Sequence, residues 1–344
     1  MAPNMIGDYF PAGGAFYNSM YGVYSSSCSS FPSPSAVIGS TKIAENSSPM
    51  PQDRFFFNYS YFDSTPLYPG DVNVNRFTPG FEKTFLCGNA SFEMRFPTAA
   101  TLDSTIVMDD VPDTSSFEFG NIAMTPKVLL RRTWCGALSM GMTITVPTAD
   151  DINAVLADGT QVAQIENEAM HLMPFVGWLW TPNPCWFAMG YLQYDVATTG
   201  NTALVDYDGT GLQEVGYLND TAFQYLDVAI GRWLYRSCAP MCVSRLRSVA
   251  VAMELHWNKS LQEGDYILSE TDGYLVGNTA ENVDVLDGTI GLHVRMCDTT
   301  ISLAYVAPLT DGYDKPFDGE FRLIVNRWFG RSSEAYGYGP YPFP

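Results

Sequence analysis

The chain has 344 residues, of which 46% are hydrophobic, 14% are aromatic and 16% are charged. Its 37 acidic and 18 basic residues give a formal net charge of −19, which excludes binding to nucleic acid or to an anionic membrane surface through a basic patch. The apolar content excludes an intrinsically disordered chain, and no stretch approaches the roughly 18 apolar residues of a membrane-spanning helix. A charged fraction this low is unusual for a soluble domain and typical of an outer-membrane barrel.

Residues 1–52 are predicted to form an irregular N-terminal extension. Tyr, Ser, Gly, Phe and Pro dominate its first forty residues, and SSSCSSFPSPS is their low-complexity centre. The first residues, MAPNMIGDYFPAGG, have neither the basic nor the apolar region of a signal peptide. A location outside the cytoplasm therefore requires that the chain is a processed form.

From residue 53 onward the pattern is one of strands and turns, with little helical periodicity. Gly88-Asn89 lies in the middle of one expected strand and marks either a turn or a bulge. DDINAVLADG, residues 150–159, is the one stretch for which we expect a short helix. Eleven stretches are expected to form strands, namely 53–62, 81–97, 116–132, 137–147, 169–180, 185–195, 222–236, 244–258, 282–296, 299–309 and 319–329.

The length and spacing of these strands favour a barrel that crosses a membrane. Globular strands average about five or six residues, whereas barrel strands need about nine to eleven to cross a bilayer. Short connections near 181–184, 237–243 and 297–298 are expected at one rim, and the long acidic connections 196–220 and 259–281 at the other. Because bacterial barrels have even strand counts, we expect one further strand and about twelve in all.

Strict alternation in VAVAMELHWN, residues 249–258, predicts a strand whose apolar face points either into a dry core or outward into lipid. Val251, Met253 and Leu255 occupy one face of this strand, and small or charged residues occupy the other. The same alternation recurs in 137–147, 222–236, 286–296 and 300–309. Lys is nearly absent from the polar faces, which suits a narrow lumen better than a water-exposed sheet face. A soluble β-sandwich with the apolar face inside remains the alternative.

Aromatic residues cluster near the strand ends, as an interfacial girdle requires. The expected girdle residues are Trp134, Trp178, Trp180, Trp186, Trp233, Tyr235, Trp257, Trp328 and Phe329.

If the small faces point inward, the lumen is lined by charged and amide side chains. They would form a polar constriction that sorts solutes by charge and size. The alternative is a salt-bridged filling that locks a closed barrel. The lumen-lining candidates are Asp227, Glu254, His256, Asp287, His293, Arg295, Arg322 and Asn326.

The seven cysteines leave at least one thiol unpaired within the chain. Cys238 and Cys242 bracket three residues between two expected strands. They form either a disulfide across a hairpin turn or a pair of free thiols, and no His/Cys cluster accompanies them to predict a zinc site.

Motifs for catalysis or metal binding are lacking. No GxSxG stretch surrounds a serine, and the three histidines follow no catalytic spacing. DYDGTGLQEVGY, residues 206–217, begins like a calcium loop but has Tyr217 where a bidentate Glu is required. We therefore expect no enzyme activity, no cofactor and no metal site, and interpret this segment as a loop turn.

Two segments resemble a signature found in uncharacterised outer-membrane-type proteins of planctomycete bacteria. They are DRFFFNYSYFDSTPLYPGDVNVNRFTPGFEKTF, residues 53–85, and ASFEMRFP, residues 90–97. FDGEFRLIVNRWFG, near the C-terminus, is similar to the closing hairpin of those proteins and to the last strand of outer-membrane barrels, which ends on an aromatic residue. The resemblance implies a cell-envelope β-barrel and supplies no substrate.

The sequence thus predicts an all-β, up-and-down antiparallel transmembrane β-barrel of about 12 strands over residues 53–330. In that arrangement residues 1–52 are a plug or a periplasmic segment, and 331–344 form a Tyr/Pro/Gly-rich tail. We expect a porin-like channel of the bacterial outer membrane, with membrane lipid and small solutes as partners. The alternatives are a structural or adhesive envelope protein with a filled barrel, whose copies contact one another, and a soluble secreted binding module.

Overall fold

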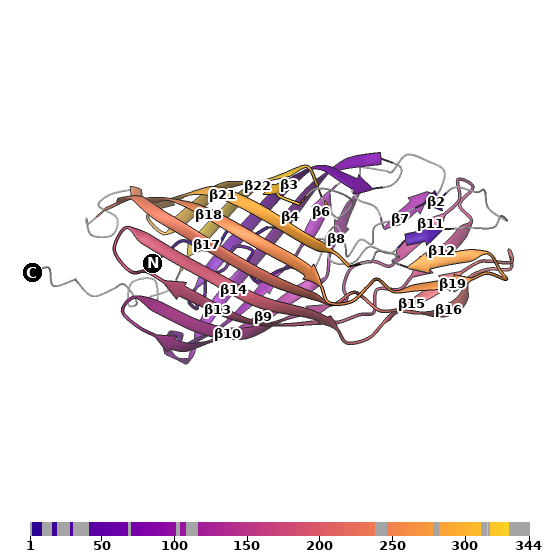
Figure 1. Cartoon of the computed structure of the whole chain (residues 1–344), viewed down its shortest axis with the longest axis horizontal. Coiled ribbons are helices and arrows are strands. Elements are labelled where there is room, and N and C mark those ends of the chain that lie inside the picture. The colour runs from indigo at the N-terminus through magenta and orange to yellow at the C-terminus, as the bar shows by residue number, and fades with distance from the viewer. Residues whose placement is uncertain are drawn as a thin grey trace, which may run out of the picture.

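The protein is all-β, and its largest sheet closes on itself (Figure 1). The computed structural model describes residues 2–8, 16–18, 28–29, 41–67, 70–100, 104–107, 116–237, 246–277, 282–310, 315 and 317–329. Each strand of the ring pairs antiparallel with its neighbours, and β3 closes the ring by pairing with both β4 and β23. The barrel strands are β3 (Arg54–Leu67), β4 (Gly70–Phe85), β5 (Ala90–Arg95), β9 (Ile122–Arg132), β10 (Gly136–Val146), β13 (His171–Trp180), β14 (Trp186–Ala197), β17 (Phe223–Arg236), β18 (Leu246–Ser260), β21 (Asp284–Met296), β22 (Thr299–Pro308) and β23 (Gly319–Trp328).

The twelfth strand is β4, which the sequence pattern did not separate from its neighbour. The predicted strand 81–97 breaks at a one-turn 3-10 helix, η1 (Leu86–Gly88), so Gly88-Asn89 belongs to a hairpin turn and not to a bulge. Leu86, Cys87 and Gly88 all have positive φ there, which is the backbone form of a tight turn. Beyond η1, β6 (Thr98–Ala100) pairs with β4 and with β8 (Phe117–Phe119), which lengthens the barrel wall next to β5 and β9.

The outer face of the barrel is apolar and the inner face is polar. On β18, Met253 and Leu255 are 63% and 53% exposed, whereas Glu254 and His256, which alternate with them, are buried. The same outward apolar face continues over the neighbouring strands, where Ile230 is 53% exposed. A continuous apolar surface of this kind far exceeds the patches that soluble monomers expose. The chain is therefore a transmembrane β-barrel and not a sandwich with a dry centre.

Aromatic side chains gather at the rim formed by the short turns. Trp134, Trp180 and Trp186 are exposed there, as a girdle at the membrane interface requires. The prediction is wrong for Trp233 and Trp328, which are both 8% exposed. Both occupy strand positions whose side chains point into the barrel. The Trp233 ring packs there against the Phe187 ring, and their centroids are 4.8 Å apart.

The long connections build two further sheets at the opposite end of the barrel (Figure 1). Ala154, Val162, Val205, Leu218 and Val276 share a small apolar core there. One sheet contains β7 (Thr105–Val107), β11 (Ile152–Val155), β12 (Gln161–Ile165), β15 (Asn201–Val205) and β16 (Gln213–Leu218). The other contains β1 (Phe16–Asn18), β2 (Cys28–Ser29), β19 (Tyr266–Ser269) and β20 (Tyr274–Gly277).

The helix predicted for 150–159 is wrong, because residues 152–155 form strand β11. Ile152 and Ala154 alternate with more exposed residues, and pairing with β7 and β12 overrides the local helical tendency. The first half of the calcium-like segment is a bend between β15 and β16, and its second half belongs to β16. The Asp206 carboxylate accepts hydrogen bonds from the N–H groups of Gly209 at 2.8 Å and Gly211 at 3.2 Å. Among the described residues, no helix is long and apolar enough to span a membrane.

Candidate functional site

Residues 2–8 and 41–53, here called the inner segment, lie within the barrel lumen and are almost entirely buried. Their two stretches pair through the Met5 N–H, which donates to the Ser47 carbonyl at 2.8 Å, and the Asn46 N–H, which donates to the Ile6 carbonyl at 3.2 Å. Gly7 makes this approach feasible, because its φ is +80° and a Cβ there would lie 2.7 Å from the Glu45 backbone. The lumen is thus filled by the chain's own N-terminal region.

One side of the lumen, here called the charged wall, consists of inward side chains of β3, β4, β5, β9 and β23. The Glu45 carboxylate of the inner segment contacts Arg76 at 2.9 Å and Arg322 at 3.0 Å. Arg54 contacts Glu82 at 3.0 Å and Glu93 at 2.6 Å. Further ion pairs join Arg95 to Glu93 at 2.6 Å and Lys127 to Glu82 at 2.9 Å. Since these charges are buried, each depends on its partner.

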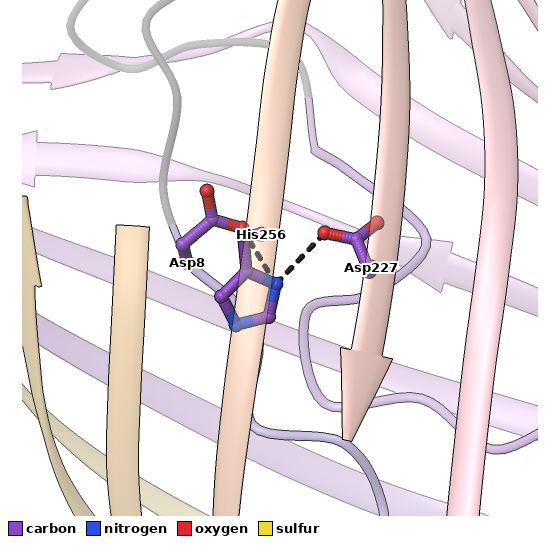
Figure 2. Close-up of side chains that lie close together, drawn as sticks. All are labelled: Asp8, Asp227 and His256. Carbon is purple, nitrogen blue, oxygen red and sulfur yellow. Dashed lines mark hydrogen bonds and ion pairs between the residues drawn. The ribbon is translucent and has the colours of Figure 1, made fainter. Parts of the chain in front are cut away.

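A second cluster joins the inner segment to β17 and β18 (Figure 2). Figure 2 shows His256 directed toward Asp8 and Asp227, with Nδ1 at 3.4 Å and 2.8 Å from their carboxylates. Lys42 Nζ lies 2.5 Å from Asp8 and 3.1 Å from Asp227. Asp8, Asp227 and His256 are close enough together to hold a metal ion. The Lys42 ammonium already supplies the positive charge that the two carboxylates need, so the cluster is stable without one.

Glu254 on β18 holds the inner segment through its backbone. The carboxylate accepts a hydrogen bond from the Ile6 N–H at 2.9 Å and one from the Gly7 N–H at 2.8 Å. On the next stretch, the Ile43 N–H donates to Gln193 Oε1 at 2.9 Å. Two barrel side chains thus satisfy backbone donors that would otherwise be buried without an acceptor.

The opposite side of the lumen, here called the apolar wall, lies mainly on β13, β14 and β17. Its inward side chains pack against apolar residues of the inner segment, and the two sets form one buried cluster. The inner segment contributes Ala2, Met5, Ile43 and Ala44. The wall contributes, among others, Phe175, Leu179, Phe187, Met189, Tyr191 and Trp233.

The structure brings together most of the eight residues that the sequence assigned to the lumen. Asp227, Glu254, His256, Asp287, His293, Arg322 and Asn326 are all buried. Asn326 donates to Asn46 of the inner segment at 2.8 Å, and His293 Nδ1 lies 2.7 Å from Ser302 Oγ. Arg295 is separate from this set, because it lies over the Trp328 ring at 5.8 Å near the short-turn rim. Cys238 and Cys242 lie outside the described residues.

Sequence reasoning missed the residues that the inner segment contributes and most of the charged wall. The wall residues show a usable signal, since Arg54, Asn58 and Ser60 alternate with large aromatics along β3. The inner segment has no periodicity that could place Asp8, Lys42 or Glu45. The missed wall residues are Arg54, Arg76, Glu82, Glu93, Arg95 and Lys127.

No protein-family model matches the chain, and no curated protein matches it. Among solved structures, an outer-membrane channel from Pseudomonas putida F1 has a TM-score of 0.52 at 10% identity, over 81% of this chain and 97% of that chain. The β domain of the Bordetella autotransporter BrkA has a TM-score of 0.47 at 11% identity, over 81% of this chain and 100% of that chain. The NanC porin has a TM-score of 0.45 at 9% identity, over 80% of this chain and 100% of that chain. The chain has the fold of an outer-membrane β-barrel.

Proposed function

We propose that the chain is a porin-like channel of the bacterial outer membrane for the passive passage of small solutes. The observation that carries this proposal is the opposite polarity of the two barrel faces. The outward apolar side chains suit hydrocarbon, and the inward charged and amide side chains suit a path for polar solutes. The Pseudomonas putida F1 protein with the similar fold is an outer-membrane channel, and we propose no catalytic role here.

In this proposal the inner segment controls passage. It fills the lumen in the described conformation, so the conducting state is one in which residues 41–53 have left at least one wall. Ile43 and Ala44 pack against the apolar wall. The other contacts to be broken are polar and lie at a few points, chiefly Lys42 against Asp227 and Glu45 against Arg76 and Arg322. Such contacts exchange more readily for water and solute than a continuous apolar interface does.

A structural or adhesive envelope protein with a permanently filled barrel is the second candidate. The network of buried ion pairs favours it, because removing one partner from such a pair is costly. The resemblance of residues 53–97 to planctomycete-type envelope proteins is compatible with both candidates. Membrane lipid is a partner in both, whereas small solutes are partners only in the first.

Conductance in planar bilayers separates the two candidates. In the double variant Lys42→Met/Glu45→Gln, only His256 remains between Asp8 and Asp227, and Arg76 and Arg322 lose the Glu45 carboxylate, so the inner segment is held less firmly at the wall. We expect this variant to show discrete conductance steps that are larger or more frequent than those of the wild type. Arg327→Gln, at an exposed rim pair with Asp298, is the matched control and should conduct as the wild type does.

Folding of every variant is checked by heat-modifiable migration on gels and by detergent dependence. If correctly folded wild type and double variant both show no discrete steps, the channel proposal fails and the filled structural barrel takes its place.

A further inference from the structure

The Lys42–Glu45 turn of the inner segment presents one carboxylate and one ammonium to two oppositely charged clusters of the barrel wall, and Asp8 of the other stretch lies beside Lys42 and His256. Glu45 lies against Arg76 and Arg322 at 2.9 and 3.0 Å, and Lys42 lies against Asp227 at 3.1 Å. The Glu45 N–H donates to the Lys42 carbonyl at 3.2 Å. The two residues therefore belong to one turn, with Cα atoms within about 7 Å of each other. A short stretch of chain thus carries both charges, as a zwitterion does.

The basic cluster keeps unsatisfied donors although three carboxylates lie in it, namely Glu45, Glu320 beside Arg322 at 3.1 Å and Glu93 beside Arg95 at 2.6 Å. Arg322 Nη1 and Arg95 Nη2 are buried and have no hydrogen-bond acceptor among the described residues. Arg95 contacts the same turn, because its Nη1 donates to the Lys42 carbonyl at 3.0 Å. Buried guanidinium donors without acceptors are costly, and the guanidinium group matches a carboxylate bidentately. This cluster therefore suits a carboxylate that reaches further into it than Glu45 does.

The acidic cluster has acceptors to spare in the same way. Asp227 Oδ2 and Asp287 Oδ1 are buried and have no donor among the described residues. Asn258 joins Asp287 to the inner segment, since it accepts from Lys42 Nζ at 2.6 Å and donates to Asp287 at 3.3 Å. A compact ammonium with three donors is the group that such carboxylates bind.

We propose that these two clusters are the two ends of a binding site for small zwitterionic solutes of short-peptide size. The inference rests on the proposed channel function and names the solute class of that same lumen. When residues 41–53 leave, the Lys42 ammonium and the Glu45 carboxylate leave together, and each cluster loses one countercharge. Glu320 and Glu93 remain beside the arginines, and His256 remains beside Asp227. A solute with both groups restores both, whereas an anion or a cation restores only one and meets repulsion at the other. A zwitterion therefore competes with the inner segment for the same contacts.

The test uses the full-length Lys42→Met/Glu45→Gln variant in liposomes and four probes that share a triglycine core and differ in which terminal charges they carry. Triglycine is the zwitterion, with an extended span of roughly 10 Å for three residues. N-acetyl-triglycine keeps only the carboxylate, triglycinamide keeps only the ammonium, and N-acetyl-triglycinamide keeps neither. We expect triglycine to enter fastest and to bind the detergent-solubilised variant roughly tenfold more tightly than either singly capped form, since one lost charge-assisted hydrogen bond costs about that much.

Wall variants assign each end of the site. Adding Arg322→Gln should remove the advantage of triglycine over triglycinamide, and adding Asp227→Asn should remove its advantage over N-acetyl-triglycine. Arg327→Gln at the rim should change neither ratio. If the Arg322 variant does not fold, the four-probe series on the parent variant alone still decides the question.

The failures of the two proposals are distinguishable. Equal entry and equal binding of all four probes, in a variant that conducts potassium chloride, overturn the zwitterion site and leave the channel standing. Absence of conductance overturns the channel, and calorimetric binding of the four probes then still supports or overturns the site. Preference for N-acetyl-triglycine over triglycine also overturns it, because it would show an anion site.

Discussion

The two walls of the lumen hold the same inner segment by different physical means. The charged wall uses ion pairs, such as Glu45 with Arg76 and Arg322, that require particular partners at 2.9 and 3.0 Å. The apolar wall uses the packing of Ala2, Met5 and Ile43 against aromatic rings and methionine. Burial of apolar area is non-directional, whereas ion pairs depend on geometry. The comparison teaches that the apolar wall supplies attraction and the charged wall determines where the segment sits.

The largest expected effect comes from leaving a charge of the charged wall without its partner. Glu82→Ala deprives Lys127 of its carboxylate and Arg54 of one of two, because Glu82 contacts them at 2.9 and 3.0 Å. We expect the free energy of unfolding in lipid bilayers, measured by urea titration, to fall by about 3–5 kcal/mol. The double variant Glu82→Gln/Lys127→Met removes both charges of one pair and should recover part of the loss. A double variant less stable than the single one would contradict this account.

Truncating a side chain of the apolar wall should lower the free energy of unfolding somewhat less. A second substitution that removes a charge should not recover this loss. Met189 is fully buried in the cluster that joins this wall to the inner segment. Met189→Ala leaves a cavity, and we expect a loss of about 2–5 kcal/mol in the same titration. Met189→Leu conserves volume and serves as the control, with an expected loss below about 1.5 kcal/mol. If the two variants are equally destabilised, packing at this wall is not what holds the segment.

A smaller effect is expected where the wall and the inner segment meet through a glycine. A Cβ on Gly291 would lie 2.1 Å from Ile6 Cδ1, so Gly291→Ala pushes the inner segment away at a cost of about 1–3 kcal/mol. Ile6→Val removes the clashing methyl group. The double variant Gly291→Ala/Ile6→Val should therefore be more stable than the sum of the single effects predicts, which a double-mutant cycle measures. If the two single effects on the free energy of unfolding simply add, Ile6 and Gly291 are not in contact.

The smallest effect is expected outside the lumen. Arg327 and Asp298 form a pair at 2.8 Å, but their side chains are 61% and 43% exposed. Because water and salt screen such a pair, Arg327→Gln should change the free energy of unfolding by no more than about 1 kcal/mol. A loss of stability as large as that of Glu82→Ala would contradict this account, because it would mean that exposed and buried ion pairs contribute equally.

The barrel was predictable because its strands obey a strict period of two. Alternation on β18 placed Met253 outside and Glu254 inside, and both placements are confirmed. The same period contradicts the girdle prediction for Trp233, because Trp233 occupies a position of its strand that points into the barrel. Local pattern failed at β11, where pairing with neighbouring strands decides the conformation.

The inner segment was not predictable to the same degree. Lys42 and Glu45 sit in an irregular stretch whose neighbours in space are far away in sequence, such as Asp227 and Arg322. No local spacing links residues that a barrel brings together from opposite ends of the chain. The two-residue period of the strands could have placed the wall arginines in the lumen. Only the folded structure shows which residues pair with them.

The seam between β3 and β23 has a consequence for how far the inner segment can move. The inner segment runs directly into Arg54, the first residue of β3, and Arg54 donates to Asn326 on β23 at 2.7 Å across that seam. Because the chain is continuous at this point, residues 41–53 remain anchored to the closing strand pair even when they leave a wall. Any opening of the lumen is therefore a swing about a fixed end of the segment.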